Sequence, residues 1–361
     1  MPHGQVNLIQ YGLGNVGRAL VRQIRAGRER LAARTGLALR HVALADSRGV
    51  LQAAEGLDDA ALLRALSAKD NGLPLTRLPG AEPRPAGPIV PRLSDGPCIV
   101  VDVTAADGME DVALDALARG WGVALANKRP LTGSLETFRR LTSSGRLRCE
   151  ATVGAGLPWI EMLAHLLDTG DHILRLEATV SGTLGYLMSQ LEAGVPLSQA
   201  VVEARQRGYT EPDPRDDLGA SDVRRKALIL ARLLGQPLEW EDIPAQPLYP
   251  PAWDALEVDG FMARLPELDA EYAERMRRAK AANRTLRYSV EVGEGSCTVG
   301  LREVPIDSPL GTLQGPACLL AFHTERYSPT PLVISGPGAG AEVTAAGVYA
   351  DVIALAREQA R

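Results

Sequence analysis

The first apolar run of the chain, residues 6–11 (VNLIQY), has the length and composition of a buried strand, and a helical pattern follows it directly. Strand and helix patterns then alternate through the first 150 residues, with further strands predicted at 41–45, 98–104, 122–126 and 147–151. Such alternation is typical of an α/β fold, here a Rossmann-type doubly wound parallel sheet with helices on both faces.

The pattern changes after about residue 150 to helices mixed with alternating strands, for example at 173–180 and 286–292. This indicates a second, α+β domain. Near the end, the glycine-rich segment 336–340 opens a long amphipathic helix at 342–356. We therefore predict a dinucleotide-binding domain at 1–150, completed by 327–361, and a second domain at 151–326. The segment 79–97 carries repeated Pro and Gly and is expected to be a surface excursion between strands.

Composition narrows the possible classes of protein. The chain has 361 residues and a net charge of −5, which gives no reason to expect nucleic acid as a partner. Its four cysteines are scattered without a C-x-x-C pair, so neither a zinc site nor a disulfide framework is indicated. The first strand begins near Met1 and no apolar run approaches ~18 residues, so we expect no signal peptide, no membrane span and a cytoplasmic location.

A G-x-G-x-x-G motif, Gly12-Leu13-Gly14-Asn15-Val16-Gly17, joins the first strand to the first helix. In this context it predicts a dinucleotide site, although a glycine-rich turn that binds nothing is the alternative. The next strand ends at Asp46, an acid that can hydrogen-bond an adenosine ribose, whereas Arg48 could pair with a 2′-phosphate. The choice between NAD and NADP stays open, with a slight preference for NAD. Two further residues, Thr104 and Gly340, complete the predicted cofactor site.

Residues 208–226 are rich in acids and lead into a helix. Asp222 and Lys226 lie at i and i+4, on one face beside the apolar stripe of that helix, so the lysine should be partly desolvated. We expect Ser221 to cap the helix and Gly235 to stop it. The alternative is a surface ion pair worth roughly 0.3–0.5 kcal/mol. A half-buried Asp/Lys pair beside several acids favours instead a site that moves a proton and binds a positively charged small molecule.

Taken together, several motifs resemble homoserine dehydrogenase over nearly the whole chain, in the form that lacks a C-terminal regulatory domain. They are the glycine-rich motif at 12–17, Ala126-Asn127-Lys128, residues 150–158 (EATVGAGLP), residues 181–186 (SGTLGY), residues 208–226 and residues 338–347 (GAGAEVTAAG). The resemblance implies an NAD(P)-dependent oxidoreductase of threonine and methionine biosynthesis that interconverts homoserine and aspartate 4-semialdehyde by hydride transfer. It also implies a homodimer held together through the second domain, which binds the substrate.

The resemblance assigns roles to individual residues. Lys226, Lys128 and Asp222 match catalytic positions, and Lys128 also lies at the predicted nicotinamide. Glu211 resembles the acid that binds the ammonium group of homoserine. The rest of the substrate site would comprise Asp217, Tyr209, Gly182, Thr183 and Gly208.

The segment 150–157 resembles the monovalent-cation loop of the family, which implies ligands from Glu150 and from the carbonyls of Val153, Ala155 and Leu157. The residues alone favour a hinge between domains. Two residues depart from the family pattern, Cys149 and Arg129, and neither removes a catalytic group. Because the sequence stops at Arg361, we expect no effector domain and no allosteric inhibition by threonine.

Two other functions are compatible with a nucleotide fold. Aspartate-semialdehyde dehydrogenase needs a nucleophilic cysteine, and no cysteine here lies in a loop near a histidine. A catalytically inactive NAD(P) sensor would have no use for the proton relay that Lys128, Asp222 and Lys226 suggest. Turnover of homoserine with NAD(P) distinguishes the enzyme from the sensor.

Overall fold

The structure is a computed structural model that describes residues 4–84 and 96–359. The chain divides into two compact units, one formed by Met1–Gly156 with Gly340–Arg361 and the other by Leu157–Ala339. The general division matches the prediction, in which a C-terminal segment returns to the first domain.

Both domain boundaries differ from the predicted ones. Residues 151–156 belong to the first unit, and residues 327–339 belong to the second. The second shift has a clear physical reason: β12 (Leu332–Pro337) pairs antiparallel with β11 (Ala317–Thr324) and is therefore part of the sheet of the second unit.

The sheet of the first unit has the strand order β4-β3-β2-β1-β5-β6-β7 in the described residues. The strands β2, β1, β5, β6 and β7 are parallel, whereas β3 and β4 pair antiparallel at one edge. The chain leaves β1 toward β2 on one side and later returns to β5 on the other, so the strand order switches between β1 and β5. Open α/β sheets bind their ligands beyond the carboxyl ends of the strands at such a point. The bounds are β1 Gly4–Tyr11, β2 Leu37–Ala45, β3 Gly49–Gln52, β4 Ala81–Pro83, β5 Cys98–Asp102, β6 Gly122–Leu125 and β7 Leu147–Arg148.

The predicted strands of this unit are confirmed, the last one only in part. β7 is short, and Glu150–Thr152 forms the 3-10 helix η2 where the strand was expected to continue. Within the predicted excursion, β4 joins the edge of the sheet, while residues 85–95 lie outside the described residues.

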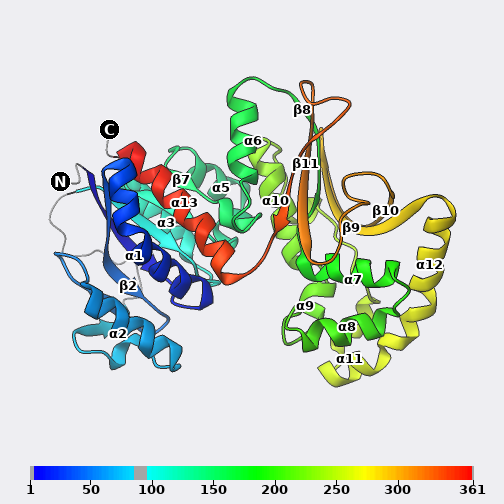
Figure 1. Ribbon diagram of the computed structural model, residues 1–361, viewed down its shortest axis with the longest axis horizontal. Coiled ribbons are helices and arrows are strands. Elements are labelled where there is room, and N and C mark those ends of the chain that lie inside the picture. The colour runs from blue at the N-terminus through cyan, green and yellow to red at the C-terminus, as the bar shows by residue number, and fades with distance from the viewer. Residues whose placement is uncertain (1–3, 85–95, 360–361) are drawn as a thin grey trace. The chain divides into compact units, whose positions relative to one another are not determined.

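Helices cover both faces of this sheet. The first and last helices of the chain, α1 and α13, lie side by side against one face, where they share a core with β1, β2, β5 and β6 (Figure 1). Helix α3 also packs against β5 and β6. The bounds are α1 Asn15–Thr35, α2 Asp59–Asp70, η1 Leu75–Arg77, α3 Met109–Ala118, α4 Arg129–Thr132, α5 Leu135–Thr142 and α13 Ala341–Gln359.

The second unit contains an antiparallel sheet of order β10-β9-β8-β11-β12. Residues 285–290 of β9 are all buried, and α7, α10 and α12 pack against this strand. The strands are β8 Ile173–Thr179, β9 Arg284–Gly293, β10 Ser296–Pro305, β11 and β12. The helices are α6 Trp159–Asp168, α7 Gly182–Glu192, α8 Leu197–Gln206, α9 Arg215–Leu218, α10 Ser221–Leu233, η3 Trp240–Asp242, η4 Pro251–Ala255, α11 Val258–Arg264, η5 Leu265–Leu268 and α12 Asp269–Ala281. This confirms the predicted α+β second domain.

Among the described residues, we find no helix with the length and apolar character that a membrane span requires.

Candidate active site

In the glycine-rich loop between β1 and α1, backbone segments lie very close to one another. Gly12 has a φ of +100°, and its amide donates to the carbonyl of Ala45, the last residue of β2. A Cβ on Gly17 would lie 2.1 Å from the carbonyl oxygen of Gly12, so only glycine fits there. Gly14 is the N-cap of α1. The N-terminus of α1 therefore opens directly at the carboxyl end of β1, as the motif predicts.

Asp46 is a buried carboxylate surrounded by hydrogen-bond donors of the protein. It is 6% exposed, and its carboxylate accepts hydrogen bonds from the backbone of Arg48 and Gly49 (both 2.8 Å), from Lys69 Nζ (2.8 Å) and from the backbone of Leu75 (2.9 Å). Burial raises the pKa of Asp46, but these hydrogen bonds outweigh it, so the pKa lies below its usual value. The carboxylate thus organises the turn after β2, and its hydrogen bond from the ribose stays a prediction.

Arg48, in contrast, is exposed at the carboxyl end of β2. Its carbonyl accepts a hydrogen bond from the backbone of Arg84 (2.9 Å). The Arg84 guanidinium lies 5.3 Å from the centre of the Tyr11 ring and 3.4 Å from the carbonyl oxygen of Asp46. Two arginines are therefore neighbours at the carboxyl end of the strands, where the adenosine ribose of a dinucleotide is expected.

The ends of β5 and β6 are linked by a buried polar network. One oxygen of Asp102 accepts from the amide (2.9 Å) and hydroxyl (2.7 Å) of Thr104, and the other accepts from Asn127 Nδ2 (3.0 Å). Asn127 also donates to the carbonyl of Ala106 (2.9 Å). Lys128 follows directly and is partly exposed at the carboxyl end of β6. The network positions two predicted site residues, Thr104 and Lys128.

The predicted cation loop packs on α13 within the first unit. Glu150 is 6% exposed, and its backbone N–H donates to Oδ2 of Asp351 (2.9 Å), which is 8% exposed. A Cβ on Gly347 would lie 2.1 Å from the carbonyl oxygen of Ala155. Val153 and Ala155 are buried here, whereas Leu157 belongs to the second unit. Gly340 directly precedes α13, and its carbonyl accepts from the backbone and hydroxyl of Thr344.

Lys226 lies on α10 in the second unit and is 8% exposed. Its Nζ donates to the carbonyl oxygen of Val180 (2.6 Å) and lies 3.0 Å from Oδ2 of Asp222. Burial lowers the pKa of Lys226, but Asp222, with contributions from Cys318 and Asp217, outweighs burial and holds the pKa above its usual value. The lysine is therefore a buried cation with a fixed direction, as predicted, and not part of a surface pair.

The ends of α10 differ slightly from the prediction. Ala220, with a φ of +57°, is the N-cap, and Ser221 is already helical, so no serine side chain caps the helix. The helix ends at Leu233 and Gly235 follows in the left-handed conformation, as expected. Arg224 stacks its guanidinium 3.9 Å from the centre of the Trp240 ring and is only partly exposed.

Four predicted substrate residues meet at the start of α7. The Thr183 hydroxyl donates to the carbonyl of Tyr209 (2.5 Å), and Asp217 accepts from the backbone N–H of Glu211 (2.8 Å). Burial, together with the Glu211 and Asp222 carboxylates, raises the pKa of Asp217 above its usual value, although hydrogen bonds from Glu211 and Thr183 oppose this. The Glu211 side chain is exposed.

The backbone around these residues is shaped by two glycines. Gly208 has a φ of +69° and turns the chain from α8 into the acid-rich segment. A Cβ on Gly182 would lie 3.0 Å from the carbonyl oxygen of Pro316, so the start of α7 runs close to the loop before β11. The structure thus brings Lys226 together with the predicted substrate residues of the second unit.

All four cysteines, at positions 98, 149, 297 and 318, are buried. Burial raises the pKa of the Cys98 and Cys297 thiols to about 12. A nucleophilic cysteine requires an accessible thiol with a lowered pKa. This disfavours the acyl-enzyme chemistry of an aspartate-semialdehyde dehydrogenase.

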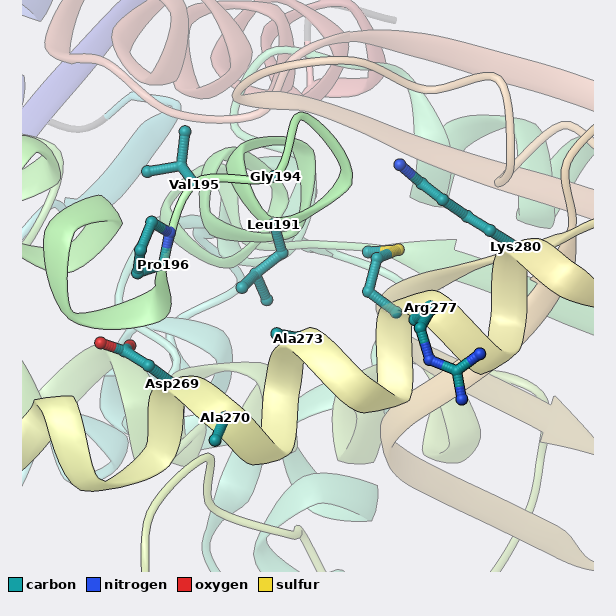
Figure 2. A pocket seen from close by; sticks show the side chains of 10 residues that line it. Leu191, Gly194, Val195, Pro196, Asp269, Ala270, Ala273, Arg277 and Lys280 are labelled. Carbon is teal, nitrogen blue, oxygen red and sulfur yellow. The ribbon is translucent and has the colours of Figure 1, made fainter.

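A separate hollow of about 480 Å³ lies between α12 and the turn after α7 (Figure 2). Leu191, Val195 and Pro196 form one side of it, and Ala273 and Lys280 line the other. It is formed by other residues than those around Lys226.

Comparison with known families decides the assignment. Residues 158–353 match the homoserine dehydrogenase family, and residues 12–147 match its NAD-binding domain. The chain belongs to the homoserine dehydrogenase family. The second family model begins at the glycine-rich loop and the first spans all predicted substrate residues.

Individual relatives support the same family. The chain is 38% identical over 357 residues to a bifunctional aspartokinase/homoserine dehydrogenase of Zea mays, covering 96% of this chain and 38% of the relative. It is 37% identical to a homoserine dehydrogenase of Emericella nidulans, covering 72% of this chain and 75% of the relative. A solved hyperthermophilic archaeal homoserine dehydrogenase in complex with NADPH has 25% identity and a TM-score of 0.74, covering 97% of both chains. The chain thus spans about two fifths of the length of the bifunctional relative.

Sequence reasoning missed four residues that organise the two parts of the site. They are Gln10, Asp102, Val180 and Asp351. A signal was present for Gln10, because it is a polar residue in a mostly apolar strand.

Proposed function

We propose that the protein interconverts L-homoserine and L-aspartate 4-semialdehyde by hydride transfer with NAD(P), with lysine as the acid/base. The observation that carries this proposal is Lys226, a buried ammonium held by Val180 and Asp222 next to an acid-rich turn. Such a group moves a proton at a substrate oxygen. Family membership supports the reaction, and the geometry supports the residue.

The raised pKa of Lys226 determines in which direction of the reaction the lysine can act without first changing its protonation state. At neutral pH the lysine is protonated, so in the direction of reduction it donates its proton to the aldehyde oxygen; the bound dinucleotide would supply the hydride. In the reverse direction the alcohol proton passes to the lysine after it has released its own. Asp222 supplies the negative charge that stabilises the protonated form.

Lys128 is the second proposed catalytic residue. It lies at the carboxyl end of β6, beside the network of Asp102, Thr104 and Asn127. An ammonium at this edge stabilises the negative charge that develops on the substrate oxygen as hydride moves. We assign it this electrostatic role at the nicotinamide.

The substrate ammonium is assigned to Glu211, with Asp217 as the half-buried acid beside it. The two carboxylates share one turn, and the backbone of Glu211 is fixed by Asp217. Tyr209 and Thr183 supply neutral contacts through their carbonyl and hydroxyl groups, and Gly182 and Gly208 leave room for the amino acid.

For the cofactor we propose NADP in preference to NAD, which reverses the earlier slight preference. That preference depended on Asp46, whose carboxylate is occupied by four hydrogen bonds. Arg48 is exposed beside Arg84, and guanidinium groups suit a 2′-phosphate. The archaeal relative solved with NADPH is consistent with this choice.

We further propose that Glu150 and the carbonyls of Val153, Ala155 and Leu157 hold a sodium or potassium ion. The buried Glu150 carboxylate and its neighbour Asp351 offer hard oxygen atoms and negative charge, which fit such an ion. Within the described residues no group of three or more His, Cys, Asp or Glu side chains forms a metal cluster, so this site depends on carbonyls. The ion would rigidify the loop.

Dimerisation through the second unit and a cytoplasmic location are also part of the proposal. Both are predictions from the sequence. Light scattering on the purified protein measures the mass, and a monomer at working concentration would contradict the dimer.

The decisive experiment is a turnover assay with L-homoserine and each oxidised dinucleotide, followed by the absorbance of reduced nicotinamide. We expect turnover, with a higher kcat/KM for NADP than for NAD. A protein that binds NADPH but turns over neither homoserine nor aspartate 4-semialdehyde would be a sensor and not an enzyme.

A further inference from the structure

Gln10 is a fully buried amide at the end of β1, one residue before the tyrosine that precedes the glycine-rich loop. Its Nε2 donates to the carbonyl oxygens of Gly12 and Gly17, both at 3.0 Å. One side chain therefore bridges the first and last glycines of the motif. The two carbonyls belong to the turn and to the first turn of α1, so the amide connects strand, loop and helix.

The other end of the amide contacts a buried histidine on the neighbouring strand. The Oε1 atom of Gln10 lies 3.2 Å from Nε2 of His41, which is 4% exposed on β2. Burial, with a smaller effect of Arg28, lowers the pKa of His41 to about 4, so the ring is neutral near pH 7. Because Oε1 can only accept, the His41 proton must be on Nε2. The two carbonyls of the loop set which end of the Gln10 amide faces them, and the histidine, by donating to the other end, holds the amide in that orientation.

This orientation has a direct consequence for the backbone of the loop. In a planar trans peptide the N–H points opposite to the carbonyl. When Gln10 holds the carbonyl of Gly12 toward the interior, the N–H of Leu13 points away from Gln10. A dinucleotide pyrophosphate needs N–H groups directed at it and carbonyl oxygens directed away.

We propose that Gln10 and His41 are positioning residues that set the glycine-rich loop for the dinucleotide. The inference rests on the proposed binding of NAD(P). Neither side chain touches the cofactor, because both are buried behind the loop. They act by fixing the direction of two carbonyls before the ligand arrives, so that binding does not have to order the loop.

The test is the dissociation constant for NADPH, measured by calorimetric titration without substrate, together with kinetics. Gln10→Met keeps the volume and removes both donors. We expect it to raise the Kd and the KM for NADPH about 10- to 100-fold, from two lost hydrogen bonds, while kcat at saturating NADPH stays close to wild type. His41→Phe should raise the Kd about threefold, since the amide remains but can rotate.

The double variant tests whether His41 acts on the loop through Gln10. With Gln10 replaced, His41 has nothing to orient, so Gln10→Met with His41→Phe should bind NADPH like Gln10→Met alone. If the losses of NADPH affinity in the two single variants added up in the double variant, His41 would not act through Gln10. An unchanged Kd in folded Gln10→Met would overturn the whole inference.

Asn7 provides a matched control for stability. It is a 4% exposed amide on the same strand, and it accepts from the Arg40 guanidinium (2.9 and 3.1 Å) without contacting the loop. Asn7→Leu should lower Tm but leave the Kd for NADPH unchanged. If Asn7→Leu weakened NADPH binding as much as Gln10→Met, the effect would be a general loss of stability. If Gln10→Met does not fold, His41→Phe decides, and an unchanged Kd in that variant overturns the inference. A wild-type protein that bound no NADPH would contradict the proposed function instead.

Discussion

Replacement of Lys226 by methionine separates catalysis from folding. A general acid–base group typically contributes 10²–10⁴-fold, which corresponds to about 3–5 kcal/mol of transition-state stabilisation. We expect Lys226→Met to lose this factor in kcat in both directions. The chain offers a matched control in Arg225, the preceding cation, whose guanidinium lies 5.6 Å from the centre of the Trp240 ring. Arg225→Met should keep kcat within about twofold of wild type.

The cost of Lys226→Met in stability should be small, because the contributions of Lys226 to the free energy of unfolding oppose each other. The change removes the bond from Nζ to Val180, worth about 1.5–3 kcal/mol for a charged donor. It also removes the ion pair with Asp222, which is 48% exposed and therefore screened by solvent to about 1 kcal/mol or less. Against these, burying an ammonium costs several kcal/mol, which methionine does not incur. We expect the free energy of unfolding to change by at most about 2 kcal/mol.

Lys226→Arg adds a second test, since arginine keeps the charge but does not release its proton near neutral pH. It should retain the KM for homoserine better than methionine does, while kcat falls by a similar factor. Steady-state kinetics and thermal unfolding on the same preparations measure both quantities. If Lys226→Met kept more than about a tenth of wild-type kcat, the lysine would be a structural cation and the mechanism wrong.

Three further predictions concern other residues. Asp222→Asn should move the basic limb of the pH–kcat profile for reduction to lower pH, because the carboxylate raises the pKa of Lys226 and burial lowers it; an unmoved limb would contradict this assignment. Glu211→Ala should raise the KM for homoserine with little change in kcat, since an ammonium contact acts in ground and transition states alike. An unchanged KM would exclude Glu211 as the partner of the substrate ammonium. Arg48→Ala should raise the KM for NADP more than that for NAD, whereas Asp46→Ala should lower Tm without reversing this preference; equal effects on both cofactors would remove Arg48 from the 2′-phosphate.

The features predicted correctly from the sequence depend on neighbours along the chain. The order strand, glycine-rich loop, helix follows from residues within one turn of each other, and so does the face shared by Asp222 and Lys226. The second unit could be identified as α+β because its strands alternate in polarity. Each of these conclusions needs only the local period of the backbone.

The features that were wrong or missed depend on contacts distant in sequence. Asp46 turns inward because Lys69 and Leu75, more than twenty residues later, supply donors to its carboxylate. β12 belongs to the second unit because β11 offers an edge to pair with. No local pattern contains either fact, so neither the hydrogen bonds of Asp46 nor the domain boundary could be predicted from the sequence.

The charges of the acid-rich segment show why an amino acid suits this site. Asp213 is neutralised by Arg215, whose Nη2 lies 2.6 Å from its Oδ2, and Asp222 is neutralised by Lys226. Glu211 shares its turn with Asp217, and the pKa of Asp217 is raised by burial and by neighbouring carboxylates. A raised pKa means that the ionised form is disfavoured until positive charge arrives. The ammonium group of homoserine would supply that charge, so substrate binding should itself lower the pKa of Asp217 and favour the ionised turn.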